Sequence, residues 1–159
     1  MENSKQKILI TGASSGLGRE LAHQYAQKGN VELILVARRK EALEKVAKKC
    51  EAFENVKTRV YSVDIGSQEQ VENLLSSVKD IDILINGAGY GIMKDFSEFS
   101  DHDVVNMFDT NVIGTIQLTT EIAKRMREKK SGTIVTIASL AGKIATPKSS
   151  VYSATKFAL

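Results

Sequence analysis

Short apolar segments alternate along the chain with longer segments in which apolar residues recur every three or four positions. Continuous apolar runs are typical of strands in a parallel sheet that is covered on both faces. The longer spacing is typical of amphipathic helices. The predicted strands cover residues 7–11, 31–37, 56–63, 81–86 and 133–138, and the predicted helices cover residues 17–28, 41–52, 67–78 and 101–130, with a last helix that begins near Ser150.

Local signals mark the ends of several predicted helices. Gly29 follows the first helix and supplies the left-handed residue that commonly ends one. Ser67 and Gln70 have the spacing of a capping box, in which two side chains at the start of a helix each accept a hydrogen bond from the other residue's backbone amide. Ser100 and Asp103 repeat this spacing. We therefore expect helices to begin at both serines.

Strands that alternate with helices of these lengths form βαβ units and place the strands in parallel. Connections between parallel strands are right-handed, which gives a doubly wound, Rossmann-like α/β sheet with strand order 3-2-1-4-5. A ligand crevice is expected at the carboxyl ends of the strands, where this order reverses. No linker or internal repeat divides the chain, so residues 1–159 are predicted to form a single domain.

The first predicted strand ends in a glycine-rich turn, residues 11–18, with the sequence TGASSGLG. Gly12 permits a tight turn, Gly16 removes a Cβ that would obstruct a phosphate, and Gly18 lets the helix pack closely on the strand. The free amides of the first helical turn then face an anion. The spacing G-x-x-x-G-x-G differs from the commoner G-x-G-x-x-G, and a purely structural turn is the alternative interpretation.

Composition and charge narrow the function classes. The formal net charge is +3, and the basic residues are scattered among acidic ones, which argues against nucleic-acid binding. Cys50 is the only cysteine, so no intrachain disulfide can form, and no cluster of His, Cys and Asp has metal-ligand spacing. The sequence shows no signal-peptide core and no apolar run near the roughly 18 residues of a membrane span, so we expect a cytoplasmic protein without a membrane partner.

Several motifs follow one another along the chain: the turn at residues 11–18, Asp64, the segment Asn86-Gly87-Ala88-Gly89, Asn111, Ser139 and the segment Tyr152-Ser153-Ala154-Thr155-Lys156. Together and in this order they resemble those of the short-chain dehydrogenase/reductase family. The family usually has a second asparagine where this chain has Gly87. The resemblance implies an oxidoreductase that transfers a hydride between a nicotinamide cofactor and a carbonyl or secondary-alcohol substrate.

Tyr152 and Lys156 lie four positions apart, which places them on one face of a helix. A tyrosine has an ordinary pKa near 10, and a neighbouring ammonium group favours the phenolate form. We expect Tyr152 to act as general acid and base, with Ser139 hydrogen-bonded to the substrate oxygen. The resemblance further implies that Lys156 binds the nicotinamide ribose and that Asn111 holds a water linking Lys156 to solvent. An exposed tyrosine and lysine on a surface helix are the alternative interpretation.

The end of the second predicted strand indicates the cofactor. Enzymes that bind NAD commonly carry an acidic residue about 20 positions after the glycine turn, whereas an arginine there accommodates the 2′-phosphate of NADP. Arg38 and Arg39 stand at this place, so we expect NADP(H) over NAD(H), with Arg38 as the main determinant. Two arginines that merely solvate a loop are the alternative. The expected cofactor-binding residues are Gly12, Ser14, Ser15, Gly16, Leu17, Gly18, Arg38, Asp64, Ile65, Asn86, Ala88, Gly89, Tyr152 and Lys156.

The resembled family continues beyond the tyrosine helix with a sixth strand, a loop that covers the substrate and a seventh strand, whereas this sequence stops at Leu159. We therefore expect a C-terminally truncated piece of a longer reductase, rather than a natural truncation, with the fifth strand as an uncovered edge.

Two functions from different classes follow. The favoured one is an NADP-dependent oxidoreductase acting on a small-molecule carbonyl or alcohol. The alternative is a non-catalytic dinucleotide-binding or interaction module, because the fold alone does not decide between them.

A homo-oligomer would pair through the helices that carry Asn111 and Tyr152. The aromatic and apolar residues Tyr90, Met93, Phe96 and Phe99 either line a substrate mouth or pack within their own loop.

Overall fold

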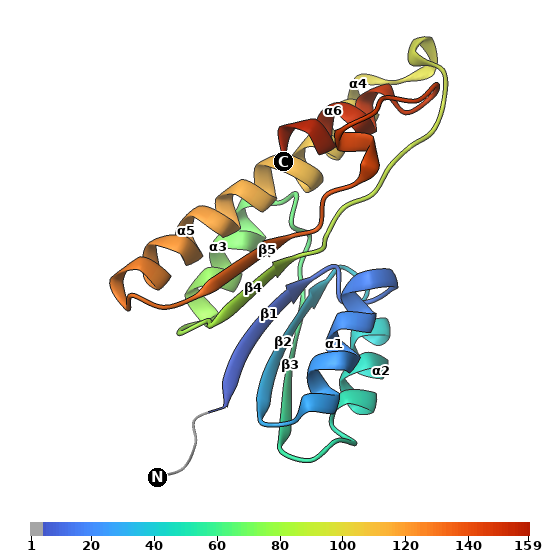
Figure 1. Cartoon of the computed structure of the whole chain (residues 1–159). Coiled ribbons are helices and arrows are strands. Elements are labelled where there is room, and N and C mark those ends of the chain that lie inside the picture. Colours follow the sequence, from blue (N-terminus) through green and yellow to red (C-terminus); the bar gives the residue numbers. More distant parts are fainter. Residues whose placement is uncertain (1–4) are drawn as a thin grey trace.

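Five parallel strands form the sheet at the centre of the computed structural model, which describes residues 5–159 (Figure 1). The strand order is β3-β2-β1-β4-β5, so the predicted doubly wound, Rossmann-like α/β fold is confirmed. β4 and β5 are shorter than predicted, although backbone hydrogen bonds continue their pairing at Asp82 and Ile137. The strands are β1 (Gln6–Thr11), β2 (Val31–Ala37), β3 (Val56–Ser62), β4 (Ile83–Asn86) and β5 (Thr133–Thr136).

Helices cover both faces of the sheet. α1 and α2 lie on one face, α3 and α5 lie on the other, and α4 and α6 project beyond the carboxyl ends of the strands (Figure 1). Within residues 5–159, no helix combines the length and the apolar character that a membrane crossing requires. The helices are α1 (Gly16–Lys28), α2 (Lys40–Cys50), α3 (Gln68–Ser77), α4 (Asp101–Phe108), α5 (Gly114–Glu128) and α6 (Ser150–Ala158).

Two hydrophobic clusters, one on each face, form the core. Successive residues of β1 point to opposite faces, so Ile8 packs in the cluster with α1 and α2 while Leu9 packs in the cluster with α3 and α5. Cys50, at the end of α2, is fully buried in the first cluster and is not paired. Burial, and then the charge of Glu51, raise the pKa of the Cys50 thiol to about 11.

The predicted long helix over residues 101–130 is interrupted. A five-residue π-helical segment, η2 (Asp109–Ile113), separates α4 from α5.

The capping box of Ser100 and Asp103 at the start of α4 is confirmed. The second predicted capping box is only half formed: Ser67 Oγ accepts from the Gln70 amide, but the Gln70 side chain accepts from the Asp64 amide, 2.9 Å away, instead of from Ser67. The loop before α3 therefore uses this glutamine to fix Asp64.

β5 lies at one edge of the sheet, as predicted. It pairs with β4 on one side, and all four of its residues are exposed, with Ile134 at 37% and Val135 at 41%. The apolar side chains of this strand therefore have little cover within residues 5–159.

Thr11 joins the two halves of the sheet where the strand order reverses. Its side-chain oxygen accepts hydrogen bonds from the amides of Gly87 and Ala88, each 3.0 Å away, and the residue is 2% exposed. The neighbouring Gly12 has a φ of +70°, and a Cβ there would lie 2.5 Å from the Gly87 carbonyl oxygen. The glycine turn after β1 and the loop after β4 are therefore in direct contact.

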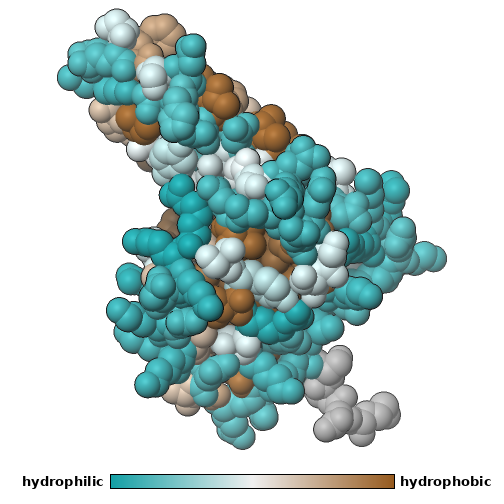
Figure 2. All heavy atoms as spheres, turned by 180° about the vertical axis from the view of Figure 1, so that it is seen from behind, coloured by the Kyte–Doolittle hydropathy of each residue, from teal (hydrophilic) through white to brown (hydrophobic). Residues whose placement is uncertain are grey.

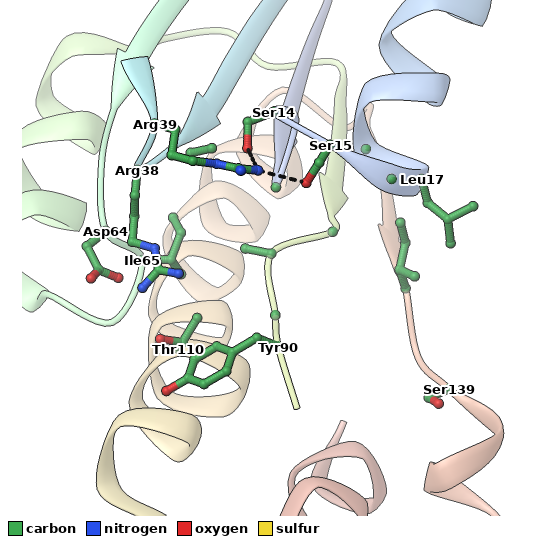
Figure 3. A pocket seen from close by; sticks show the side chains of 18 of the residues that line it. Ser14, Ser15, Leu17, Arg38, Arg39, Asp64, Ile65, Tyr90, Thr110 and Ser139 are labelled. Carbon is green, nitrogen blue, oxygen red and sulfur yellow. Dashed lines mark hydrogen bonds between the residues drawn. The ribbon is translucent and has the colours of Figure 1, made fainter. Parts of the chain in front are cut away.

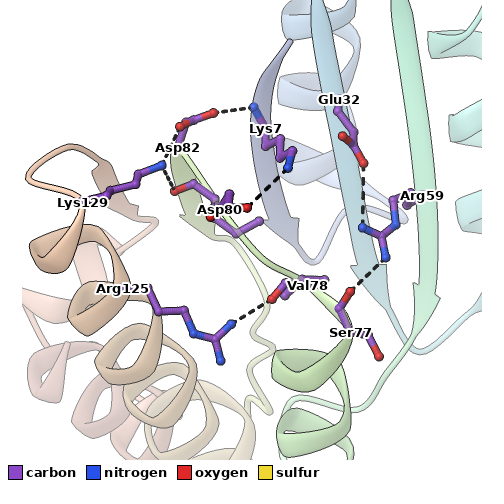
Figure 4. Close-up of polar contacts among 10 residues, drawn as sticks. Lys7, Glu32, Arg59, Ser77, Val78, Asp80, Asp82, Arg125 and Lys129 are labelled. Carbon is purple, nitrogen blue, oxygen red and sulfur yellow. Dashed lines mark hydrogen bonds and ion pairs between the residues drawn. The ribbon is translucent and has the colours of Figure 1, made fainter. Parts of the chain in front are cut away.

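Asp82 makes the corresponding connection at the opposite end of the sheet (Figure 4). One carboxylate oxygen accepts from the Lys7 amide at 2.8 Å, and the other accepts from the Lys129 ammonium at 2.7 Å. Desolvation would raise the pKa of this carboxyl, but the hydrogen bonds and charges of Lys129 and Lys7 outweigh it and lower the pKa below its ordinary value. Asp82 thus ties the start of β4 to β1 and to the end of α5.

Replacing Thr11 by Val keeps the shape of the side chain but removes the acceptor for two partly buried amides. We expect the free energy of unfolding to fall by about 2 kcal/mol, because each amide left without a partner costs roughly 1 kcal/mol or more. Urea denaturation checks this. The matched variant Thr11→Ser keeps the hydroxyl and loses one methyl, so it should cost about 1 kcal/mol. Equal stabilities of the two variants would contradict the role of the hydroxyl.

Replacing Asp82 by Asn should weaken the dependence of stability on pH. Because the pKa of Asp82 is lowered in the folded chain, its contribution is fully present above the unfolded pKa of about 3.9 and is lost as the pH falls through the folded pKa. We expect Asp82→Asn to cost about 1 kcal/mol at pH 7 and less as the pH approaches 3. Unfolding free energies measured over this range check it, and a constant difference would contradict it.

Candidate active site

A cleft of about 620 Å³ runs along the carboxyl ends of the strands, between the turn after β1 and the loop after β4 (Figure 3). It is lined by residues that follow every strand of the sheet. Except for Asn86 and Asn111, all the predicted site residues lie on its surface: Gly12, Ser14, Ser15, Gly16, Leu17, Gly18, Arg38, Asp64, Ile65, Ala88, Gly89, Ser139, Tyr152 and Lys156.

One end of the cleft is the amino end of α1. Gly16 has a φ of +54°, and no atom lies within 4 Å of the place where its Cβ would stand, so the backbone is open to the cleft. Ser15, the N-cap residue, makes no side-chain cap, and the first turn contains no acidic residue. Amides at such a helix end suit an anion. The bare backbone and the helix end together form a cradle that fits a phosphate group.

Two arginines stand beside this cradle. The Arg39 guanidinium donates to the Ser14 and Ser15 hydroxyls, at 3.3 and 3.1 Å (Figure 3). The Arg38 guanidinium lies 5.9 Å from the centre of the Tyr90 ring. Both arginines line the cleft, so this end carries positive charge. Sequence reasoning named Arg38 and did not single out Arg39, whose contact with the serines depends on how the turn folds back.

The other end of the cleft holds Tyr152 and Lys156 on α6, together with Ser139. The Lys156 ammonium donates to the Ile137 carbonyl at 3.2 Å and lies 5.7 Å from the centre of the Tyr152 ring. Lys156 is 8% exposed, and burial lowers the pKa of its amine. The Ser139 hydroxyl accepts from the Ala141 amide at 3.1 Å and caps the short 3-10 helix η3 (Leu140–Gly142). The predicted serine, tyrosine and lysine therefore line the same cleft.

Asn111 lies behind the cleft, in the π-helical segment η2, and is fully buried. Its amide group donates to the Tyr90 carbonyl at 2.8 Å and to the Thr155 hydroxyl at 3.0 Å, while its oxygen accepts from the Tyr90 amide at 3.0 Å. One side chain thus joins the loop after β4 to α6. The water that Asn111 was expected to hold stays a prediction.

Asn86, expected beside the cofactor, points away from the cleft. Its amide nitrogen donates to the hydroxyls of Thr119 on α5 and Thr136 on β5, at 2.8 and 3.3 Å. The residue is 3% exposed. The following backbone of Gly87, Ala88 and Gly89 lines the cleft instead. Asn86 therefore belongs to the packing between β4, β5 and α5.

Several lining residues were missed because they carry no motif of their own. They flank motif residues, and this is the only signal in the sequence that could have found them. The residues missed are Ala37, Arg39, Val63, Gly87, Tyr90, Thr110, Ile137 and Ala138, of which Arg39, Gly87 and Tyr90 were named from the sequence without being expected to bind the cofactor.

Across residues 5–159, no three His, Cys, Asp or Glu side chains gather in a group that could hold a metal ion.

The chain is similar to known proteins over nearly its whole length. The family model described as short chain dehydrogenase matches residues 6–159. The chain is 36% identical over 157 residues to an NADP-dependent 3-hydroxy acid dehydrogenase of Schizosaccharomyces pombe, an alignment that covers 96% of the chain and 61% of that relative.

Two solved structures are also similar. An alcohol dehydrogenase from Comamonas testosteroni specific for bulky-bulky ketones superposes with a TM-score of 0.92 at 28% identity, covering 98% of this chain and 64% of the other. A short-chain dehydrogenase from Sphingobium yanoikuyae in complex with NADPH superposes with a TM-score of 0.89 at 31% identity, covering 96% and 61%. The chain thus spans less than two thirds of the length of each of these relatives.

Proposed function

Because the chain belongs to the short-chain dehydrogenase family, we propose that it carries the cofactor-binding and catalytic part of an NADP(H)-dependent oxidoreductase. Its substrate would be a small-molecule carbonyl or the corresponding secondary alcohol. The observation that carries this proposal is one cleft with a phosphate cradle at one end and Ser139, Tyr152 and Lys156 at the other.

The cleft suits both phosphate-bearing parts of NADP(H), the pyrophosphate and the 2′-phosphate. The cradle at α1 suits the pyrophosphate, because bare backbone and free amides face it. Arg38 and Arg39 suit a 2′-phosphate, because a guanidinium pairs with phosphate through several hydrogen bonds. Arg39 is already held over the turn by Ser14 and Ser15. We therefore assign the discrimination between NADP(H) and NAD(H) to both arginines together.

Proton transfer would be carried out by Ser139, Tyr152 and Lys156. A bound nicotinamide would supply or accept the hydride. In the reducing direction Tyr152 gives its phenolic proton to the carbonyl oxygen, and in the oxidising direction it takes the proton of the alcohol. Ser139 donates a hydrogen bond to the same substrate oxygen. Lys156 stands close enough to stabilise the negative charge that remains on Tyr152, and its lowered pKa makes it readier to pass on a proton than an exposed lysine.

The proposed homo-oligomer finds support in exposed apolar side chains. Seen from behind, hydrophobic side chains interrupt the largely hydrophilic surface of the part that projects beyond the sheet (Figure 2). On η2 and α6, which carry Asn111 and Tyr152, and on the adjoining α4 and α5, the exposed apolar residues are Val105, Ile113, Ile116 and Phe157. Apolar residues exposed together on neighbouring segments are typical of a protein interface.

Turnover by the purified chain, followed through the absorbance of NADPH with a panel of ketones, tests the proposal. Tyr152→Phe should lower kcat by about 10²- to 10⁴-fold, because general acid–base catalysis contributes about that much. NADPH binding, measured by calorimetry, should remain. Tyr25→Phe is the matched control, since Tyr25 lies outside the cleft. Unchanged turnover in Tyr152→Phe would defeat the assignment, and binding without turnover in the unsubstituted chain would favour the non-catalytic module.

Replacing Arg38 and Arg39 by Ala, singly and together, should weaken NADPH binding far more than NADH binding. A hydrogen bond to a charged group contributes roughly 1.5–3 kcal/mol, so we expect the NADPH Kd to rise about 10- to 100-fold for each arginine that contacts the 2′-phosphate. Fluorescence titration of both reduced cofactors measures this. Arg127→Ala on α5 is the control for loss of charge alone. An equal loss of affinity for NADPH and NADH would contradict the assignment.

A further inference from the structure

Gly91, in the loop after β4, stands against the ring of Tyr152. A Cβ at this position would lie 2.9 Å from Cδ2, 3.0 Å from Cγ and 3.3 Å from Cε2 of the ring. Ordinary van der Waals contacts begin near 3.4 Å, so no side chain fits between this backbone and the ring. The bare Cα of Gly91 is therefore one wall of the space that the phenol occupies.

Space, and not backbone conformation, explains why a glycine stands here. The glycines with positive φ in the described chain are Gly12, Gly16, Gly29 and Gly132, and Gly91 is not among them. The φ of Gly91 therefore does not lie in the left-handed region that favours glycine. The effect of adding a methyl group would come from its collision with the Tyr152 ring.

The loop that carries Gly91 cannot easily move back from the ring. The buried side chain of Asn111 holds both the amide and the carbonyl of Tyr90, the preceding residue, at 3.0 and 2.8 Å. Three residues further on, the Lys94 amide donates to the Lys148 carbonyl at 3.1 Å, and the Lys94 ammonium pairs with Asp103 at 2.6 Å. The loop is therefore tied on both sides of Gly91.

Helix α6 is held equally firmly on the other side of the contact. Asn111 also donates to the Thr155 hydroxyl at 3.0 Å. A Cβ at Gly142 would lie 2.7 Å from the Lys156 carbonyl oxygen, so η3 packs directly on the helix backbone. With both backbones fixed, the part that can yield to a methyl group at Gly91 is the Tyr152 ring.

We propose that Gly91 is a positioning residue for Tyr152. Its missing side chain sets where the phenol ring lies and therefore where the hydroxyl points within the cleft. The catalytic consequence rests on the proposed function, whereas the contact itself does not. A ring displaced from the carbonyl oxygen transfers its proton less well, because such transfer needs hydrogen-bond distance.

Two measurements on the full chain test the contact without any turnover. In the unsubstituted protein, a nuclear Overhauser effect is expected between the Gly91 Hα protons and the Tyr152 ring protons, and its absence would overturn the proposal. In Gly91→Ala, the Tyr152 ring resonances, assigned by their loss in Tyr152→Phe, should shift while those of Tyr25 and Tyr61 stay in place. Unshifted Tyr152 resonances would also overturn it.

Gly66→Ala is the matched control. Its added Cβ would lie 3.0 Å from the Thr110 hydroxyl, a slightly looser contact at another glycine without positive φ. It should leave the Tyr152 ring resonances in place, and an equal shift in both variants would count against a specific contact at Gly91.

The kinetic consequence is a fall in kcat without loss of cofactor affinity. We expect Gly91→Ala to lower kcat at least about tenfold, because small misplacements of catalytic groups are costly, while the NADPH Kd stays within about twofold. An unchanged kcat together with a shifted ring would overturn the positioning role. If the unsubstituted chain reduces no ketone, the proposed function fails, but the resonance measurements still decide whether Gly91 positions Tyr152.

Discussion

The hydrogen bonds of the Thr11 hydroxyl hold the molecule together at the place where ligand chemistry is possible. In a doubly wound sheet the loops diverge where the strand order reverses, which leaves a crevice between the first and fourth strands. Thr11 closes the bottom of this crevice, because its hydroxyl accepts hydrogen bonds from the amides of Gly87 and Ala88. The backbone that lines the cleft on one side is thus fixed to the turn that lines it on the other.

Motif residues could be placed from the sequence wherever topology alone determines their position. The carboxyl ends of parallel strands share one edge of the sheet, so the glycine turn, Asp64 and Ser139 had to meet there. Asn86 does not line the cleft, and the sequence reasoning did not consider the direction of its side chain. Leu84, two positions earlier, packs with α3 and α5, and the period of two in a strand sends Asn86 to that same side.

Other features depend on packing that no local pattern reveals. Apolar residues recur at helical spacing throughout residues 101–130, and the π-helical segment η2 changes this pattern too little to be predicted from the sequence. The contact of Arg39 with the turn serines likewise depends on where the chain folds back after β2. The close approach of Gly91 to Tyr152 joins two segments that are far apart in the sequence, and a glycine in a loop has many ordinary explanations.

Asn111 ties the loop after β4, beside Arg38, to helix α6, which carries Tyr152 and Lys156. Tyr90, whose ring faces the Arg38 guanidinium, has its backbone held by Asn111, and the same side chain holds Thr155 beside Lys156. The proposed hydride transfer requires a rigid spacing, because a nicotinamide bound in the cleft would have to lie against the substrate whose oxygen Tyr152 protonates, and a misplacement of about 1 Å is already costly. One buried amide, placed by an extra residue in a helical turn, therefore serves both binding and catalysis in the proposed enzyme.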